Sequence, residues 1–318
     1  MNINKTRYSE WIKYCEDIPL FFQPWYLDAV SENGIWDVVI SFYENNNVKG
    51  VLPYFGKKKY GITHITMPRL TPYLGPWFNY PKDSLKNTSR YQFEKKVIAD
   101  LARQVPKHSL VKMHCHPEIR NILPFIWSGY KAQVRYTYCV GKSDEKRLWS
   151  DLDSKQRNII QRAKDNIEVF ESEDSDAFYD LNKESFDRNQ EDIPYSKKFF
   201  LFLDKVLSEK QSRIILMAKD NKGRLHAAVY IVFDKRNAYC LAMGNNPQFK
   251  SSGAIAYVLW QAILRSFDRV PIFNFEGGMM PNIEQFFRSF GGVLTPYYSL
   301  CKSRNRLTQS VLQLLGKI

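Results

Sequence analysis

The sequence predicts an α/β (α+β) protein made of two modules, residues 1–142 and 143–318, each a mixed sheet flanked by helices. Two observations lead to this prediction. In each half, three strand-like segments separated by turn signals are followed by helices that alternate with further strands. Such an order gives a sheet that is antiparallel early and parallel late. Both halves also share one order, namely helix, three strands, helix, strand, helix and strand, and 318 residues are enough for two domains.

In the first half, alternating apolar residues predict the strands, and apolar residues at helical spacing predict the helices. Asn45, Asn46 and Asn47 mark the turn of a hairpin, and Pro106 ends the longest helix. The expected strands are 36–43, 48–55, 62–67, 110–115 and 132–140, and the expected helices are 24–30, 88–105 and 118–127.

The second half repeats this order after a long charged helix. The polar segments 220–223 and 234–237 are strong turn signals between three successive strands. The expected helices are 145–166, 176–189, 196–209, 253–267 and 283–290, and the expected strands are 167–170, 213–219, 225–233, 238–243, 272–275 and 293–300.

Basic residues exceed acidic ones, 46 to 33, and most of the excess lies in residues 1–142. Such a field favours polyanionic partners, which include phosphates, nucleic acid and an anionic membrane face. A charge bias that serves solubility, with no partner, is the alternative. Charge therefore does not select a substrate.

No apolar run reaches the ~20 residues of a membrane span, and no secretory leader is visible. Five scattered cysteines fit a reducing compartment. We therefore expect a cytoplasmic protein, and peripheral contact with the inner face of a membrane stays open. His114, Cys115 and His116 alternate along a strand, so that the two imidazoles share one face and Cys115 does not. We predict no metal site.

Basic side chains gather on the later part of the expected helix 145–166. Lys155 and Arg162 lie on one face, as do Arg157 and Lys164. Guanidinium groups grip phosphate in bidentate fashion, and lysine adds a mobile charge. The alternative is a solvated face paired with neighbouring aspartates.

A second candidate site is the turn after residue 243, which opens a helix. The start of a helix exposes unpaired N–H groups and attracts a pyrophosphate, and small residues let an anion approach the backbone. An ordinary serine N-cap is the alternative. The candidate ligand-binding residues are Asn245, Gln248, Ser251, Ser252, Gly253 and Ala254.

Glu276 follows a predicted strand, at the edge where open sheets place their ligands. A carboxylate there could accept the proton of an attacking amine as general base. Phe275 and Phe286 are expected to line the substrate site beside it. In the alternative interpretation, Glu276 caps the helix that begins near Pro281.

Aromatic residues in the first half form a further group of candidates. Trp25 and Tyr73 could stack on sugar rings or flat acyl groups, and nearby Arg69 suits phosphates. Packing in an aromatic core explains them equally well.

Several pieces of sequence, in this order, resemble the FemAB-like branch of the GNAT acyltransferases, in which two GNAT modules occur in tandem. The resemblance spans almost the whole chain. The pieces are FQPWY at 22–26, LPY at 52–54, KQRNIIQRA at 155–163, FNFEGG at 273–278, Phe286, FGG at 290–292 and PY at 296–297.

The resemblance implies two tandem GNAT-like modules, with the acceptor on the first and the donor on the second. It implies an N-acyltransferase that moves an acyl group from acetyl-CoA or another acyl-CoA to an amine of an amino sugar or a cell-envelope precursor. Residues 248–254 are then a loose variant of the CoA pyrophosphate signature, and Lys155 and Arg157 line the route of a phosphorylated substrate. The helix at 283–290 lacks the tyrosine acid of many relatives, and Tyr297 is the nearest replacement.

Three hypotheses remain open at this point. The first is the acyl-CoA-dependent transferase, whose acceptor is a small molecule or a lipid- or nucleotide-linked saccharide. The second is a FemAB-type transferase that uses charged tRNA as donor and a peptidoglycan precursor as acceptor. The third is a catalytically degenerate module that binds an anionic ligand. The oligomeric state is not predicted.

Overall fold

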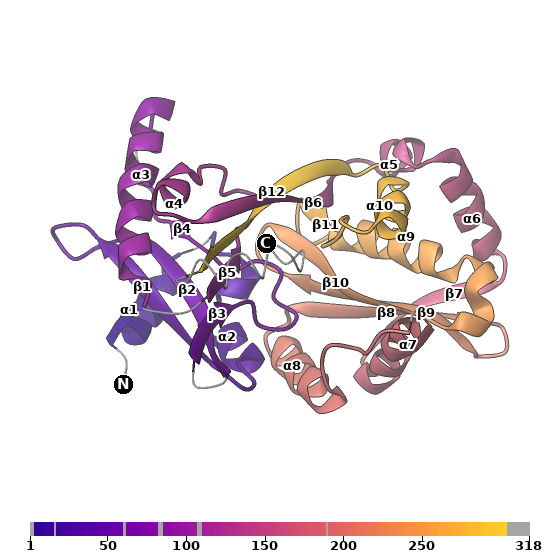
Figure 1. The fold of residues 1–318 in the computed structure, drawn as a ribbon. Helices are drawn as coiled ribbons and strands as arrows, with labels where there is room; N and C mark the ends of the chain where they lie inside the picture. The colour runs from indigo at the N-terminus through magenta and orange to yellow at the C-terminus, as the bar shows by residue number, and fades with distance from the viewer. Residues whose placement is uncertain are drawn as a thin grey trace. The chain divides into compact units, whose positions relative to one another are not determined.

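The computed structural model describes residues 3–15, 17–59, 62–81, 85–106, 110–188 and 190–303. The chain divides into two compact units, whose elements are labelled in Figure 1. Unit 1 draws its described residues from Met1–Arg135 and Pro296–Ile318, and unit 2 is Tyr136–Thr295.

Unit 1 is a mixed sheet with helices packed on it. β1 is antiparallel to β2 and β2 to β3, β3 is parallel to β5, β5 is antiparallel to β12, and β4 adds to β2. Large aromatic side chains fill its core, with Tyr8, Phe21, Phe22 and Tyr26 fully buried. The strands are β1 (Ile35–Phe42), β2 (Val48–Lys59), β3 (Ile62–Thr66), β4 (Trp77–Phe78), β5 (Leu110–His114) and the later part of β12 (Val293–Ser303); the helices are α1 (Ile3–Ile12), η1 (Leu20–Phe22), α2 (Pro24–Val30), α3 (Asn87–Gln104) and α4 (Leu123–Trp127).

Unit 2 has a sheet in the order β6, β11, β10, β9, β8 and β7, in which β10 and β11 are parallel and the other neighbours antiparallel. Its strands are β6 (Lys131–Gly141, from residue 136), β7 (Ile167–Ser172), β8 (Arg213–Asp220), β9 (Leu225–Phe233), β10 (Asn237–Asn245) and β11 (Ile272–Asn274). Its helices are α5 (Glu145–Asp151), α6 (Ser154–Lys164), α7 (Ser175–Arg188), α8 (Lys197–Glu209), η2 (Pro247–Ser252), α9 (Ala254–Ser266) and α10 (Pro281–Arg288).

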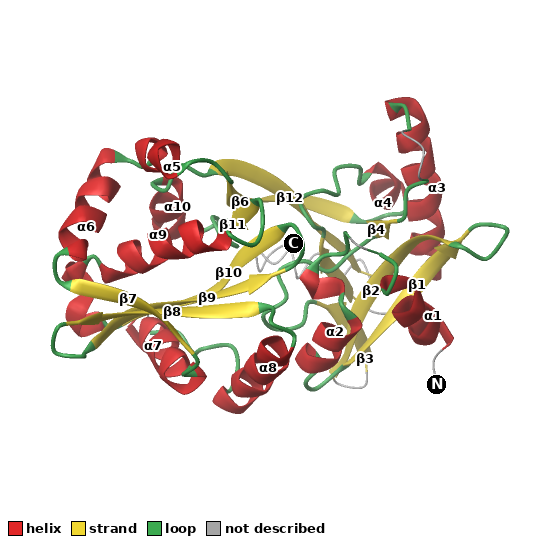
Figure 2. Ribbon diagram, turned by 180° about the vertical axis from the view of Figure 1, so that it is seen from behind, coloured by secondary structure: helices red, strands yellow, loops and turns green. Residues whose placement is uncertain are grey.

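The helices of unit 2 cover both faces of its sheet. α7 and α9 pack on opposite faces of the central strands (Figure 2). Strand β9 is accordingly buried at every position from His226 to Phe233, because neither of its faces meets water. The core cluster therefore consists of inward residues of the sheet together with the apolar side of α9, where Trp260 is the largest buried side chain.

The structure confirms the predicted mixed α/β class and most of the elements. The expected helix at 145–166 is two helices, because Leu152 has extended backbone (φ −63°, ψ 145°) and Asp153 begins a new helix. The Asp153 carboxylate accepts the Lys155 N–H at 2.8 Å. α4 covers only the second half of the expected 118–127, and α1 was not predicted.

The division of the chain also differs from the predicted boundary after residue 142. Unit 2 begins at Tyr136, and the described residues from Pro296 to Ser303 belong to unit 1. The cause is strand pairing, since Ser299 to Ser303 pair with His114 to Leu110 of β5. Pairing between segments distant in the chain overrides their order in the sequence.

Candidate functional site

Strands β10 and β11 of unit 2 run parallel over three residue pairs and then separate. The last pair joins Tyr239 to Asn274, where β11 ends. β10 continues to Asn245 in pairing with β9, and its register shifts between Cys240 and Ala242. A bulge of this kind bends a strand and increases its twist. The pairing of the two parallel strands therefore ends after Tyr239, and we call the place where it ends the β10–β11 fork.

Glu276 stands at the end of β11, beside the fork, in a left-handed backbone conformation (φ 59°). Its N–H donates to Asn274 Oδ1 at 2.9 Å, and the Thr137 hydroxyl donates to the same oxygen at 2.7 Å. Asn274 is buried, so this amide fixes the backbone that carries Glu276. Non-glycine residues with positive φ concentrate at functional sites, where surrounding contacts hold the strain.

The Glu276 carboxylate is close enough to two thiols to influence their titration. Burial raises the pKa of the Cys139 thiol to about 11, and the Glu276 charge adds to this rise. Burial also raises the pKa of Cys240 far above its usual value, again with a contribution from Glu276. Cys240 directly follows the last paired residue of β10. The Glu276 carboxylate is therefore near two thiols that stay protonated at neutral pH.

Glu276 does not cap the following helix, which was the alternative interpretation. α10 begins at Pro281, its N-cap is Met280, and no side chain caps it. Of the two residues predicted to line the substrate site beside Glu276, Phe275 is 1% exposed and packs against Phe273, Phe287 and Phe290. Phe275 is therefore packed in the core of unit 2, and its contact with substrate stays a prediction.

The predicted anion-binding turn is an ordered 3₁₀ helix, η2, followed by α9. The Gln248 N–H donates to Asn246 Oδ1, and the Asn245 N–H donates to Ser185 Oγ of α7. At the start of α9, the Ala254 N–H donates to Ser252 Oγ at 3.3 Å. The N–H groups of Ala256 and Tyr257 both donate to Gly253 O at 3.1 Å. Three of the six peptide donors that the sequence suggested for a ligand, those of Asn245, Gln248 and Ala254, are thus used within the chain.

Helix α6 packs directly on this turn. A Cβ atom added to Gly253, whose φ is 73°, would lie 2.9 Å from Ile159 Cγ2 and 3.4 Å from Ala163 Cβ. Glycine is therefore required both by the backbone conformation and by the approach of α6. Gln248 and Ser251 remain exposed on the outer side of η2.

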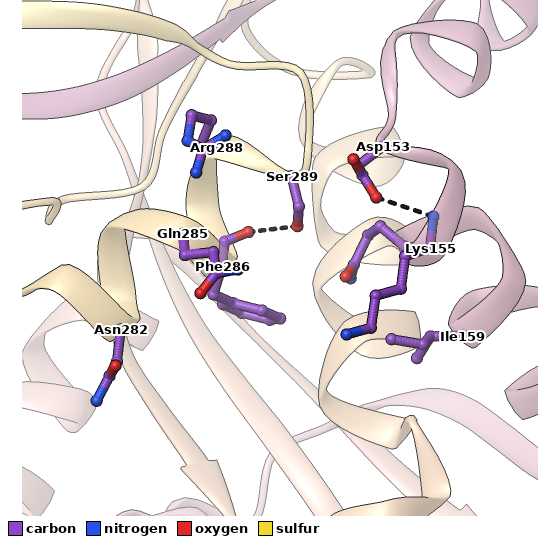
Figure 3. A pocket seen from close by; sticks show the side chains of 9 residues that line it. Asp153, Lys155, Ile159, Asn282, Gln285, Phe286, Arg288 and Ser289 are labelled. Atoms are coloured by element: carbon purple, nitrogen blue, oxygen red, sulfur yellow. Dashed lines mark hydrogen bonds between the residues drawn. The ribbon is translucent and has the colours of Figure 1, made fainter.

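A pocket of about 470 Å³ lies between α6 and α10 (Figure 3), and we call it the α6–α10 pocket. Two predicted substrate-binding residues, Lys155 and Phe286, meet there. Figure 3 shows the Lys155 side chain and the Phe286 ring extending toward each other from the two helices. The residues that line it are Asp153, Lys155, Gln156, Ile159, Asn282, Gln285, Phe286, Arg288 and Ser289.

Arg157 has a different role from the one predicted. Its Nη1 donates to the carbonyl oxygens of Ser150 at 2.9 Å and Leu152 at 2.6 Å. These carbonyls end α5 and would otherwise lack partners. Arg157 therefore joins α5 to α6, and the pocket is lined by Lys155 without it.

The remaining candidates belong to unit 1. The Arg135 Nε donates to the Tyr297 hydroxyl at 3.0 Å, and the Tyr297 ring packs edge-on against Tyr73 with centroids 5.3 Å apart. Tyr73 is fully buried and also contacts His116, so it is a core residue. Trp25 packs edge-on against Tyr26. The predicted roles of Trp25 and Tyr297 stay predictions.

The sequence interpretation missed Asn274 and Gln156. Asn274 lies within a strand, and Gln156 lies between two basic residues that drew attention as charges. Neutral amides carry no charge or metal-ligand signal, so the sequence does not distinguish a buried functional amide from an exposed one. The FNFEGG segment drew attention to Glu276 but not to Asn274.

Solved structures resemble this arrangement over nearly the whole chain. A crystal structure of FemX matches with a TM-score of 0.68 and 12% identity, covering 99% of this chain and 98% of that one. This chain has the FemAB-like, tandem-GNAT fold. The L-PGS of Bacillus licheniformis matches with a TM-score of 0.55 and 10% identity, covering 98% of this chain and 95% of that one.

A tandem GNAT protein from the clavulanic acid biosynthesis pathway supports the same fold, with a TM-score of 0.51, 9% identity and coverage of 95% of this chain and 96% of that one. No protein-family model and no curated protein matches the chain. Among the helices in the described ranges, none is long and apolar enough to cross a membrane. The resemblance to these solved structures confirms the predicted fold.

Proposed function

We propose that this chain is a transferase that moves an acyl or aminoacyl group from an activated donor to an amine, with the reaction at the β10–β11 fork. The observation that supports the proposal most is Glu276, whose backbone N–H is held by the buried Asn274 where the pairing of two parallel strands ends. FemX, tandem GNAT and synthetase structures share the fold, and they agree with a transferase.

The proposed reaction needs one base and a carbonyl held beside it. The neutral amine nitrogen attacks the acyl carbon, and the bond from that carbon to the leaving sulfur or oxygen breaks. The leaving atom keeps the electron pair and takes a proton from solvent. Glu276 accepts the proton that the amine loses, a contribution of the order of 10²–10⁴ in rate. Holding both reactants in the fork supplies the rest by orientation.

Acyl-CoA, with acetyl-CoA first, remains a proposed donor, because its slender thioester arm suits the place where the pairing of β10 and β11 ends. The turn at 246–253 supports it weakly, since the Ala254, Ala256 and Tyr257 N–H groups already have partners in the chain. CoA phosphates would then be held mainly by side chains.

Charged tRNA is the second candidate donor, and that same turn favours it. The aminoacyl ester of a charged tRNA does not require a pyrophosphate-binding site at the N-terminus of a helix. In addition, the 46 basic residues outnumber the 33 acidic ones, which favours binding of a polyanion. The proposed acceptor in either case is the amine of an amino sugar or of a cell-envelope precursor.

A comparison of Glu276→Gln with the native chain tests the function. With acyl-CoAs and charged tRNAs as donors and amino sugars or peptidoglycan precursors as acceptors, we expect native turnover with one donor class. We expect Glu276→Gln to lower kcat at least 100-fold because the amide cannot accept the proton. Donor binding, measured by thermal shift, should be unchanged.

The matched control is Glu171→Gln, which makes the same change on an exposed residue of β7. It should keep native kcat. Equal rates in native protein and Glu276→Gln would contradict the assignment of the base. A native chain that turns over no donor of either class would remove the transferase proposal and favour the degenerate binding module.

A further inference from the structure

The α6–α10 pocket contains a buried polar group without a partner. Gln156 is 5% exposed, and its Nε2 atom makes no hydrogen bond with any residue that the structure describes. Leaving a buried donor unsatisfied costs about 1–3 kcal/mol. Native proteins tolerate such a cost where a ligand supplies the missing acceptor. Because Gln156 lines the pocket, the missing acceptor is expected to come from what fills it.

Among the described residues that line the pocket, one cation has no charged partner. Arg288 is paired with Glu284 at 2.9 Å, and Asp153 uses Oδ1 to accept the Lys155 backbone N–H at 2.8 Å. The Lys155 ammonium makes no ion pair or hydrogen bond with the described part of the chain, and its side chain is exposed. An anionic group of the ligand therefore has Lys155 as its nearest uncompensated partner.

The opposite wall is aromatic and rich in amides. Phe286 is partly exposed and turns its ring toward α6 (Figure 3), and Asn282 and Gln285 supply further donors and acceptors. Aromatic faces stack on nucleobases, and side-chain amides bond to their edges. The volume of about 470 Å³ falls in the range of small-molecule sites.

We propose that the α6–α10 pocket binds a nucleoside phosphate, with the base on Phe286, an acceptor atom on Gln156 Nε2 and the phosphate on Lys155. The pocket borders the start of α9, because Ile159 both lines it and touches Gly253. This inference rests on the proposed function for its role, since acyl-CoA, tRNA ends and nucleotide-linked acceptors all carry a nucleoside phosphate. The binding itself does not depend on catalysis.

Calorimetry on the full chain tests the proposal with 3′,5′-ADP, CoA, UDP, a short RNA hairpin with an unpaired 3′ adenosine, and inorganic phosphate. We expect at least one nucleotide to bind more tightly than phosphate. Binding of 3′,5′-ADP and CoA would identify the CoA donor, the hairpin alone would identify tRNA, and UDP would identify the acceptor. Each result supports the pocket.

Two variants and a control locate the site. Lys155→Met and Gln156→Leu should each raise the nucleotide Kd at least tenfold. Lys164→Met makes the same charge change on α6 outside the pocket lining and should bind as the native chain does. Lys155→Met alters an exposed side chain, so it keeps the test meaningful if Gln156→Leu folds poorly.

Glu276→Gln should retain nucleotide binding, which separates failure of the pocket from failure of the catalytic proposal. The inference is overturned if no nucleotide binds, if phosphate binds as tightly as the nucleotides, or if Lys155→Met and Lys164→Met bind alike.

Discussion

Glu276 has a left-handed backbone conformation, which residues other than glycine rarely adopt. A carboxylate residue at φ 59° costs of the order of 1 kcal/mol relative to a right-handed or extended conformation. Two hydrogen bonds offset this cost. The N–H of Glu276 donates to the side-chain amide of Asn274, and the Thr137 hydroxyl donates to the same amide oxygen. Strain of this kind fits a side chain placed for chemistry better than one placed for stability.

His114 shows how burial alone sets the charge of a residue. It lies at the end of β5 with Nδ1 3.2 Å from Pro72 O, and its Nε2 has no hydrogen-bond partner among described residues. Burial, followed by the charges of Arg135 and Lys112, lowers the pKa of His114 to about 4. The imidazole is therefore neutral in the folded protein at pH 5 to 7.

This shift predicts an acid sensitivity with a defined sign. Unfolded histidine titrates near 6.5, so the unfolded chain binds more protons than the folded chain between about pH 6.5 and pH 4. The free energy of unfolding should therefore decrease as the pH is lowered across this window. The contribution of this residue is at most about 1.4 kcal/mol per pH unit. His114→Gln, whose amide can still bond to Pro72, should show a flatter curve in urea titrations at several pH values. Parallel curves for the two proteins would contradict the assignment.

At the scale of elements, helix α7 holds the end of β10. The Asn182 amide donates to Met243 O at 2.6 Å, and Ser185 Oγ accepts the Asn245 N–H at 2.9 Å. Gly244 lies between these contacts, and a Cβ there would be 2.7 Å from Asn182 N. The absence of a side chain at Gly244 therefore lets α7 approach the strand that forms one side of the fork.

Gly244→Ala is expected to destabilise unit 2, because backbone atoms of α7 cannot yield to a Cβ as a flexible side chain would. Overpacking of this kind costs about 1–3 kcal/mol. Thermal and urea unfolding measure the loss. Gly141→Ala in β6 is the control, since no atom lies within 4 Å of its added Cβ. It should change stability by less than about 0.5 kcal/mol. Equal stability of the two variants would contradict the close approach of α7.

At the scale of the whole chain, the last described strand returns to the unit formed by the first residues. Leu300 is fully buried and pairs with Met113 of β5, although the two residues are far apart in the sequence. Unit 1 therefore depends on residues that follow unit 2 in the sequence, whereas unit 2 is a continuous segment. Unit 1 can therefore complete its sheet only after β12 has paired with β5, a contact between segments far apart in the sequence.

Leu300→Ala is predicted to destabilise unit 1 by about 2–5 kcal/mol through the cavity it creates. Amide hydrogen exchange should show lost protection in β5 and β3 and little change in β8 and β9. Leu216→Ala, which removes a fully buried leucine of β8, should give the reverse pattern. The division into units would be contradicted if both variants lost protection in the same strands.

The sequence by itself determined the class of the fold and most of its elements. Hydrophobic periodicity and turn residues are local signals, so β8, β9, β10 and α9 lie close to where they were predicted. The candidate Glu276 was also found from sequence, because a carboxylate after a strand is a local pattern with a known place in open sheets. The early ending of α5 was missed, although Asp153 is a good N-cap.

Only the tertiary structure decided which candidates lie close together. Lys155 and Phe286 are far apart in the sequence and line one pocket, whereas Arg157, two residues from Lys155, is tied to the end of α5. Burial of Phe275 and Gln156, and the return of β12 to β5, likewise depend on contacts between distant segments. Local patterns fix secondary structure because its forces act within a few residues. Sites and strand partners depend on packing, which no local pattern encodes.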